Sequence, residues 1–97
     1  MTEPLSDDQV RAALAALPGW THEGGALKKR FQFGGFPEAI SFITRIAFEA
    51  ERLGHHPELR NVYGTVEIAL TTHDAGNRVT KLDRELAGHI ERINWTG

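Results

Sequence analysis

The stretch that decides the fold is LRNVYGTVEIALTT, residues 59–72. In its second half, apolar residues or threonine alternate with residues that are mostly polar or small. Such an alternation with a period of two is typical of a strand that has one buried face. Gly64 marks a tight turn between the two halves. The stretch therefore predicts a β-hairpin made of residues 59–63 and 65–72.

A second alternating segment, residues 27–33, lies upstream of this hairpin. Leu27, Phe31 and Phe33 fall on one side of it, and charged or polar residues fall on the other. A turn at Gly24-Gly25 connects it to a short expected strand at 20–22. The sequence thus predicts two hairpins.

Two helices are marked by capping residues. Ser6 and Gln9 match a capping box, and Pro18-Gly19 is expected to end that first helix. Thr80 and Asp83 match the same box ahead of the last helix. The apolar stripe of that helix contains Leu82, Leu86, Ile90 and Ile93.

A third helix is predicted between them, from Pro37 to the closing Gly54. Its expected buried stripe is Ala39, Ile43, Ile46, Ala47, Ala50 and Leu53. Phe42 and Phe48 lie off that stripe, so the helix is apolar over more than one face. Either a broad core contact or burial between subunits would account for this.

The order of these elements indicates the α+β class, with a four-stranded, mainly antiparallel sheet and three helices packed on one face. The 97 residues and 40% hydrophobic content fit one domain that spans residues 1–97. A net charge of −2 gives no reason to expect affinity for nucleic acid or membranes. The chain has no cysteine and no apparent leader, and we expect a cytoplasmic protein.

Candidate chemistry is concentrated in Glu51, His55, His56 and His73. Imidazole titrates near neutral pH and suits proton transfer in both directions. Glu51 lies four residues before His55 at the end of the helix. It is either an ordinary surface carboxylate or a group that orients His55. A zinc site is the main competing interpretation, but adjacent histidines chelate one ion poorly and the HExxH spacing is absent. His22 and His89 are interpreted as surface or capping residues.

The sequence resembles the pterin-4a-carbinolamine dehydratase family over nearly its whole length. The residues that carry the resemblance are Gly19-Trp20, Phe31-x-Phe33, Glu51 with His55-His56-Pro57-Glu58, Asn61-Val62-Tyr63, Thr72-His73-Asp74-Ala75-Gly76 and Thr80-x-x-Asp83. The resemblance implies a fold of this α+β type, dimers or tetramers, and an enzyme that needs no metal or other cofactor. Its activity would be the dehydration of 4a-hydroxytetrahydropterin to quinonoid dihydropterin, which supports aromatic amino acid hydroxylases.

The resemblance also implies roles for single residues. His55 and His73 would be the acid/base pair, and Glu51 would orient His55. The pterin would bind to the remaining site residues, which are His56, Pro57, Thr71, Thr72 and Asp83. Which histidine gives the proton is left open.

Two positions depart from the family pattern. Residue 59 is Leu, where many members carry a Trp close to the site, and the loop 76–79 differs from the usual glycine-leucine pattern. The first departure puts substrate binding in question, and the second puts the role of Asp83 in question, since it could simply cap its helix. Some family members bind a transcription factor or assist assembly, so a partner-binding role is the alternative function.

Overall fold

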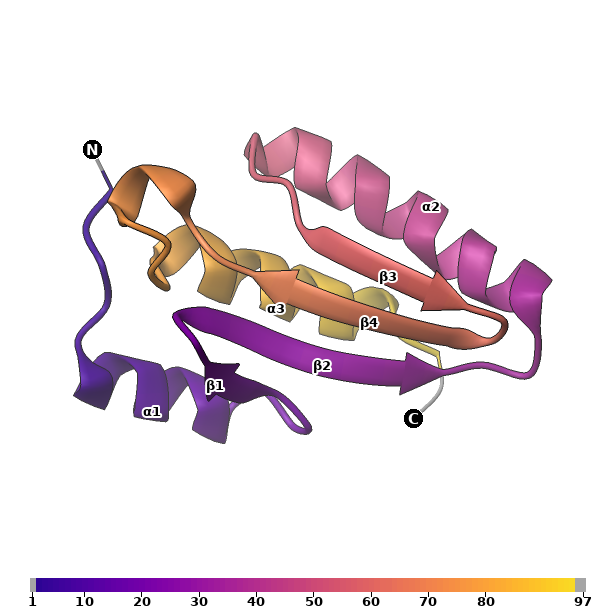
Figure 1. The fold of residues 1–97 in the computed structure, drawn as a ribbon, viewed down its shortest axis with the longest axis horizontal. Coiled ribbons are helices and arrows are strands. Elements are labelled where there is room, and N and C mark those ends of the chain that lie inside the picture. Colours follow the sequence, from indigo (N-terminus) through magenta and orange to yellow (C-terminus); the bar gives the residue numbers. More distant parts are fainter. Residues whose placement is uncertain (1, 96–97) are drawn as a thin grey trace.

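The computed structural model describes residues 2–95, and its helices alternate with pairs of strands (Figure 1). The helices are α1 (Asp7–Ala15), α2 (Phe36–Leu53) and α3 (Lys81–Ile93), and a 3₁₀ turn, η1, covers His73–Ala75. The strands are β1 (Thr21–Glu23), β2 (Ala26–Gln32), β3 (Glu58–Val62) and β4 (Thr65–Leu70).

The four strands form one sheet in the order β1-β2-β4-β3, and all three neighbouring pairs are antiparallel. In Figure 1, α3 passes behind the sheet and α2 runs along its β3 side. The predicted α+β class and the predicted hairpins are thus confirmed. β4 ends at Leu70 and not at Thr72, because Thr72 leaves the ladder and forms an isolated bridge with Arg78.

The core lies between the helices and one face of the sheet. Alternate residues of the two central strands point into it, and Leu27, Phe31, Val66 and Leu70 are buried there. Leu86 and Ile90 of α3 are fully buried against them. Burying each large aliphatic side chain stabilises the fold by about 1.5–3 kcal/mol. This packing fixes α3 under the sheet, which matters for the site.

Both predicted capping boxes are present, at Ser6 with Gln9 and at Thr80 with Asp83. The predicted end of the first helix is wrong, since α1 stops at Ala15 and not at Pro18. The amides of Ala16 and Leu17 donate to carbonyls three residues back, at 3.1 Å each. This tightening of the last turn ends the α-helix early, while Leu17 stays buried.

The predicted stripe of α2 needs correction at two positions. Phe42 is fully buried, and its ring centre lies 4.9 Å from that of Phe31 and 4.8 Å from that of Phe33. Ala47, which was expected inside, is exposed. The inward positions are 39, 42, 46 and 50, because contact with the two strand phenylalanines rotates the buried face toward Phe42. Phe42 is therefore a core residue, whereas Phe48 is 68% exposed.

Candidate active site

The end of α2 directs His55 into the protein. Gly54 adopts the left-handed conformation, with φ 63°. Its amide donates to the Glu51 carbonyl at 3.1 Å, and the His55 amide donates to the Ala50 carbonyl at 3.0 Å. These two bonds define a Schellman motif, in which the left-handed residue reverses the chain. His55 follows directly after that reversal, and its side chain is only 10% exposed.

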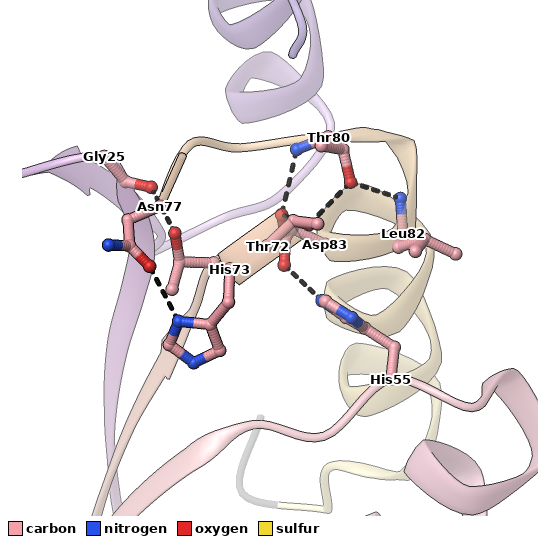
Figure 2. A network of polar contacts seen from close by, with 9 residues as sticks. Gly25, His55, Thr72, His73, Asn77, Thr80, Leu82 and Asp83 are labelled. Atoms are coloured by element: carbon pink, nitrogen blue, oxygen red, sulfur yellow. Dashed lines mark hydrogen bonds and ion pairs between the residues drawn. The ribbon is translucent and has the colours of Figure 1, made fainter. Parts of the chain in front are cut away.

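The partner of His55 is Asp83 in the first turn of α3. Nε2 of His55 lies 2.5 Å from Oδ1 of Asp83, which is fully buried (Figure 2). The other carboxylate oxygen, Oδ2, accepts from the Thr72 hydroxyl at 2.8 Å and from the Thr80 amide at 2.9 Å. Because both of these groups donate to Oδ2, Oδ1 is left to accept from the imidazole.

A chain of hydroxyl groups continues behind this carboxylate. The hydroxyls of Thr72 and Thr80 are 2.7 Å apart. The Thr72 proton already points to Asp83, so Thr80 donates to Thr72 and accepts from the Leu82 amide at 3.2 Å. Every polar atom of the cluster thus has a partner, as buried polar groups require. The cluster holds Asp83 rigidly against His55.

Asp83 therefore caps α3 and supports His55 at the same time. The resemblance placed Asp83 among the substrate-binding residues. A carboxylate with no exposed surface cannot touch a ligand, so its position in the site is behind His55.

The expected pairing of Glu51 with His55 is wrong. Oε1 of Glu51 lies 3.0 Å from Nε2 of His56, and both side chains are more than two-thirds exposed. The reason is the reversal at Gly54, which turns His55 inward and leaves His56 on the surface beside the helix end. Such an exposed pair contributes at most about 1 kcal/mol to stability.

His73 lies just past β4, as predicted, in the turn η1. Its Nδ1 is 2.6 Å from Oδ1 of Asn77, and the ring is exposed. Thr71 is fixed by its hydroxyl, which donates to the Gly25 carbonyl at 2.8 Å. Asn77 was not predicted as a site residue, although its loop had been noted as unusual for the family.

His55 and His73 both line one cavity of about 880 Å³. Its wall includes six predicted residues: His55, His56, Pro57, Thr71, Thr72 and His73. Thr2, Asp74 and Leu82 also line it and were missed. Thr2 meets the cavity only through the packing of distant segments, whereas Asp74 and Leu82 are direct neighbours of the predicted His73 and Asp83. Glu51 and Leu59 are not part of this wall, and Leu59 lies instead in a separate pocket on the sheet.

Two general findings bear on the site. Within residues 2–95, no three or more His, Cys, Asp or Glu side chains are grouped so that they could hold a metal ion. No helix in the same range is long and apolar enough to cross a membrane.

The fold and this cavity define a class of protein: an α+β domain with three imidazoles at one site, each paired with a side-chain oxygen. Groups that give and take protons at neutral pH are suited to acid/base chemistry. The family model described as pterin 4 alpha carbinolamine dehydratase matches residues 3–93. The chain belongs to this family.

Relatives and solved structures agree with that assignment. A protein of Opitutus terrae, provisionally named pterin-4-alpha-carbinolamine dehydratase, is 50% identical over 93 residues, which cover 96% of each chain. One of Bradyrhizobium diazoefficiens with the same provisional name is 52% identical over 95 residues, covering 96% of this chain and 94% of the relative.

Two solved structures are similar in fold. A transcriptional coactivator/pterin dehydratase from Brucella melitensis superposes with a TM-score of 0.88 at 37% identity, over 93% of this chain and 97% of that one. A pterin dehydratase-like RuBisCO assembly factor of the alpha-carboxysome superposes with a TM-score of 0.67 at 24% identity. The match covers 81% of this chain and 93% of that one. The latter likeness concerns the fold alone.

Proposed function

We propose that this protein dehydrates 4a-hydroxytetrahydropterin to quinonoid dihydropterin and water. The observation that supports this most is the pair of imidazoles, His55 and His73, at one cavity large enough for a bicyclic ring. Family membership supplies the class of substrate. The product is an oxidised pterin that a reductase would return to the tetrahydro form, for reuse by aromatic amino acid hydroxylases.

The reaction needs one acid and one base. Hydroxide is a poor leaving group, so the 4a-oxygen must gain a proton as its bond to C4a breaks. N5 must lose a proton as the double bond between N5 and C4a forms. Each positioned transfer contributes roughly 10²–10⁴-fold. In our proposal His55 and His73 perform these transfers, and no metal or other cofactor takes part.

The remaining site residues would bind the pterin or hold the residues that bind it. We propose that His56, Pro57, Thr71 and Thr72 contact the pterin, since all four line the cavity. Glu51, whose carboxylate is 3.0 Å from His56, would hold that ring against the ligand. Its role would therefore run through His56.

The direct test is stopped-flow dehydration of chemically generated 4a-hydroxytetrahydropterin. We expect the wild-type protein to accelerate the reaction well above its spontaneous rate, and exhaustive chelation to leave that acceleration unchanged. A protein that leaves the spontaneous rate as it is would contradict the proposal. Activity that disappears with a chelator and returns with zinc would contradict the acid/base mechanism.

A second candidate function is binding of a protein partner, and it rests on a separate surface. Phe36, Ile40 and Phe48 are exposed along α2 at 55%, 39% and 68%. Such an apolar strip is typical of an interface, and the Brucella melitensis neighbour is named as a coactivator.

For the oligomeric state, we propose that a second copy of this chain covers the strip in a homodimer or homotetramer in the cytoplasm. Residues 1–97 would act as one domain.

A further inference from the structure

The loop after β4 is closed on itself by backbone hydrogen bonds. The Thr72 carbonyl accepts from the amides of Ala75 and Asn77, at 3.1 Å each. The Thr72 amide donates in turn to the Arg78 carbonyl at 3.1 Å. The six residues 73–78 therefore form a compact turn that returns the chain to its starting point, and Asn77 ends up beside His73.

Asn77 has an unusual backbone for a residue with a side chain. Its φ is 58°, in the left-handed region that non-glycine residues seldom adopt. Asn tolerates this region better than most residues. Gly76 before it is also left-handed, with φ 74°. The turn thus adopts a conformation that suits few residues other than Asn or Gly at position 77.

The β1–β2 turn supports this conformation from the other side. A Cβ atom on Gly25 would lie 2.2 Å from the Asn77 carbonyl oxygen, so only glycine allows this approach. The Gly25 carbonyl also accepts from the Thr71 hydroxyl at 2.8 Å. Two segments far apart in sequence therefore fix the backbone of Asn77 and with it the direction of its side chain.

The contact of that side chain with His73 bears on which ring nitrogen carries the proton. Oδ1 of Asn77 is an acceptor and lies 2.6 Å from Nδ1 of His73. A neutral imidazole has one N–H and one lone pair. With the proton on Nδ1, the lone pair is on Nε2, which lies on the side of the ring away from Asn77 (Figure 2). Free imidazole side chains prefer the opposite tautomer, so this arrangement needs a partner.

We propose that Asn77 is a positioning residue that locks neutral His73 in the Nδ1–H tautomer and presents Nε2 to the ligand as a proton acceptor. This inference rests on the proposed function, in which His73 would then take the N5 proton. His55, whose Nε2–H donates to Asp83, would give a proton to the 4a-oxygen from Nδ1 of its doubly protonated ring. Solvent would then return a proton to His55 and take one from His73. Asn77, whose backbone is held by Gly25, would thus fix the tautomer of His73, as Asp83 fixes that of His55.

The tautomer can be measured without any activity. Long-range ¹H–¹⁵N spectra of labelled protein at alkaline pH distinguish a protonated Nδ1 from a protonated Nε2. We expect the Nδ1–H pattern for His73 in the wild type and in Asn77→Asp, which keeps an acceptor oxygen. Asn77→Gly keeps the left-handed backbone and lacks the acceptor, so His73 should shift toward Nε2–H.

An Nε2–H pattern in the wild type would overturn the proposal, because it would mean that the amide is turned and donates to Nδ1. Identical spectra for the wild type and Asn77→Gly would overturn it as well. Arg78→Ala, which alters an exposed side chain in the same turn, is the matched control and should leave the spectrum unchanged.

Kinetics then link the tautomer to the reaction. We expect Asn77→Gly to lower kcat by about 10-fold or more with little change in KM, because a wrong histidine tautomer removes a proton transfer and not binding. Asn77→Asp should retain most of kcat. An unchanged kcat in a correctly folded Asn77→Gly would overturn the positioning role. A wild type without dehydratase activity would refute the proposed function alone, since the spectra still decide the tautomer.

Discussion

At the scale of single residues, His55 and Asp83 form the most constrained contact of the site. The imidazole is nearly buried, and the carboxylate behind it is held by three donors. This arrangement fixes the orientation of the ring, as a buried carboxylate does in catalytic triads. His73 is held by a neutral amide at the surface. The two histidines therefore have different environments, which suits two different roles.

The first prediction separates the three histidines of the site. His55→Ala and His73→Ala should each lower kcat by roughly 10–10⁴-fold, because one proton transfer is left to water. His56→Ala should raise KM more than it lowers kcat, because it removes binding common to substrate and transition state. Steady-state kinetics after a stopped-flow calibration would measure both constants.

His22→Ala is the control for this series, since His22 is exposed on β1 and does not line the cavity. It should resemble the wild type in both constants. All variants must first show native circular dichroism and melting. Full kcat in folded His55→Ala and His73→Ala together would refute the acid/base assignment.

The second prediction concerns Asp83. Asp83→Asn keeps the size of the side chain, but its amide would donate to His55 and reverse the tautomer of that ring. We expect kcat to fall by about 10²-fold or more, on the scale of one lost proton transfer. Asp83→Ala should in addition destabilise the fold by about 1–3 kcal/mol, because donors to a buried carboxylate lose their partner.

Thermal melting and kcat would be measured on both Asp83 variants. A folded Asp83→Asn with unchanged kcat would show that Asp83 only caps α3.

At the scale of elements, α2 and α3 are joined by a second histidine contact away from the cavity. Nδ1 of His89 lies 2.7 Å from Oε1 of Glu49, and Arg52 lies 3.3 Å from the same oxygen. His89 was interpreted as a surface or capping residue, but it is half-buried and links two helices. The hydrogen bond from His89 lowers the pKa of Glu49 below its usual 4.5, and the charge of Arg52 adds to this effect.

The third prediction follows from the sign of that shift. A carboxyl group whose pKa is depressed by folding stabilises the native state above its unfolded pKa and loses this contribution as pH falls through the folded pKa. The free energy of unfolding should therefore fall as pH drops below about 4.5, the usual value for this group. Glu49→Gln should reduce this dependence.

Denaturant unfolding at a series of acidic pH values would measure the effect. Glu85→Gln, which removes an exposed carboxylate from α3, is the control and should leave the slope unchanged. Equal slopes for Glu49→Gln and the wild type would contradict the proposed link between the helices.

At the scale of the whole molecule, the inner face of α2 packs against the sheet and the outer face is left with apolar side chains. Phe42 closes the core against Phe31 and Phe33, and Trp95 lies against Phe42 with ring centres 5.7 Å apart. Phe48 is exposed on the outside of the same helix. The apolar residues of this helix thus divide between a core face and a free face. The core interpretation is confirmed for Phe42, and burial between subunits stays a prediction for Phe48.

The fourth prediction is that the free face of α2 mediates self-association. Light scattering at micromolar concentration should report a dimer or tetramer of the 10.8 kDa chain. Phe48→Glu should shift the protein toward the monomer, because a charge buried in an apolar interface is costly. Tyr63→Ser is the control, since Tyr63 is an exposed aromatic at the β3–β4 turn. A monomeric wild type would contradict the prediction and favour a different partner.

Much of the fold could be predicted from local patterns. The 59–72 hairpin, both capping boxes and the left-handed Gly54 depend on near neighbours in sequence, and all are present. The errors concern places where packing overrides the local pattern. Phe42 lies in the core, and not off the buried stripe as predicted, because two strand phenylalanines pack against it. The helix α1 ends before the predicted residue, although its apolar pattern continues to the buried Leu17.

The sequence by itself determined which residues could perform proton chemistry, since His55, His56 and His73 stand out by type and spacing. Only the tertiary structure decided their partners. His55 contacts Asp83, 28 residues away, because α3 packs under the sheet. His56, and not His55, contacts Glu51 because the chain reverses at Gly54. A hydrogen bond between distant residues depends on how whole elements pack, and no local period in the sequence records that packing.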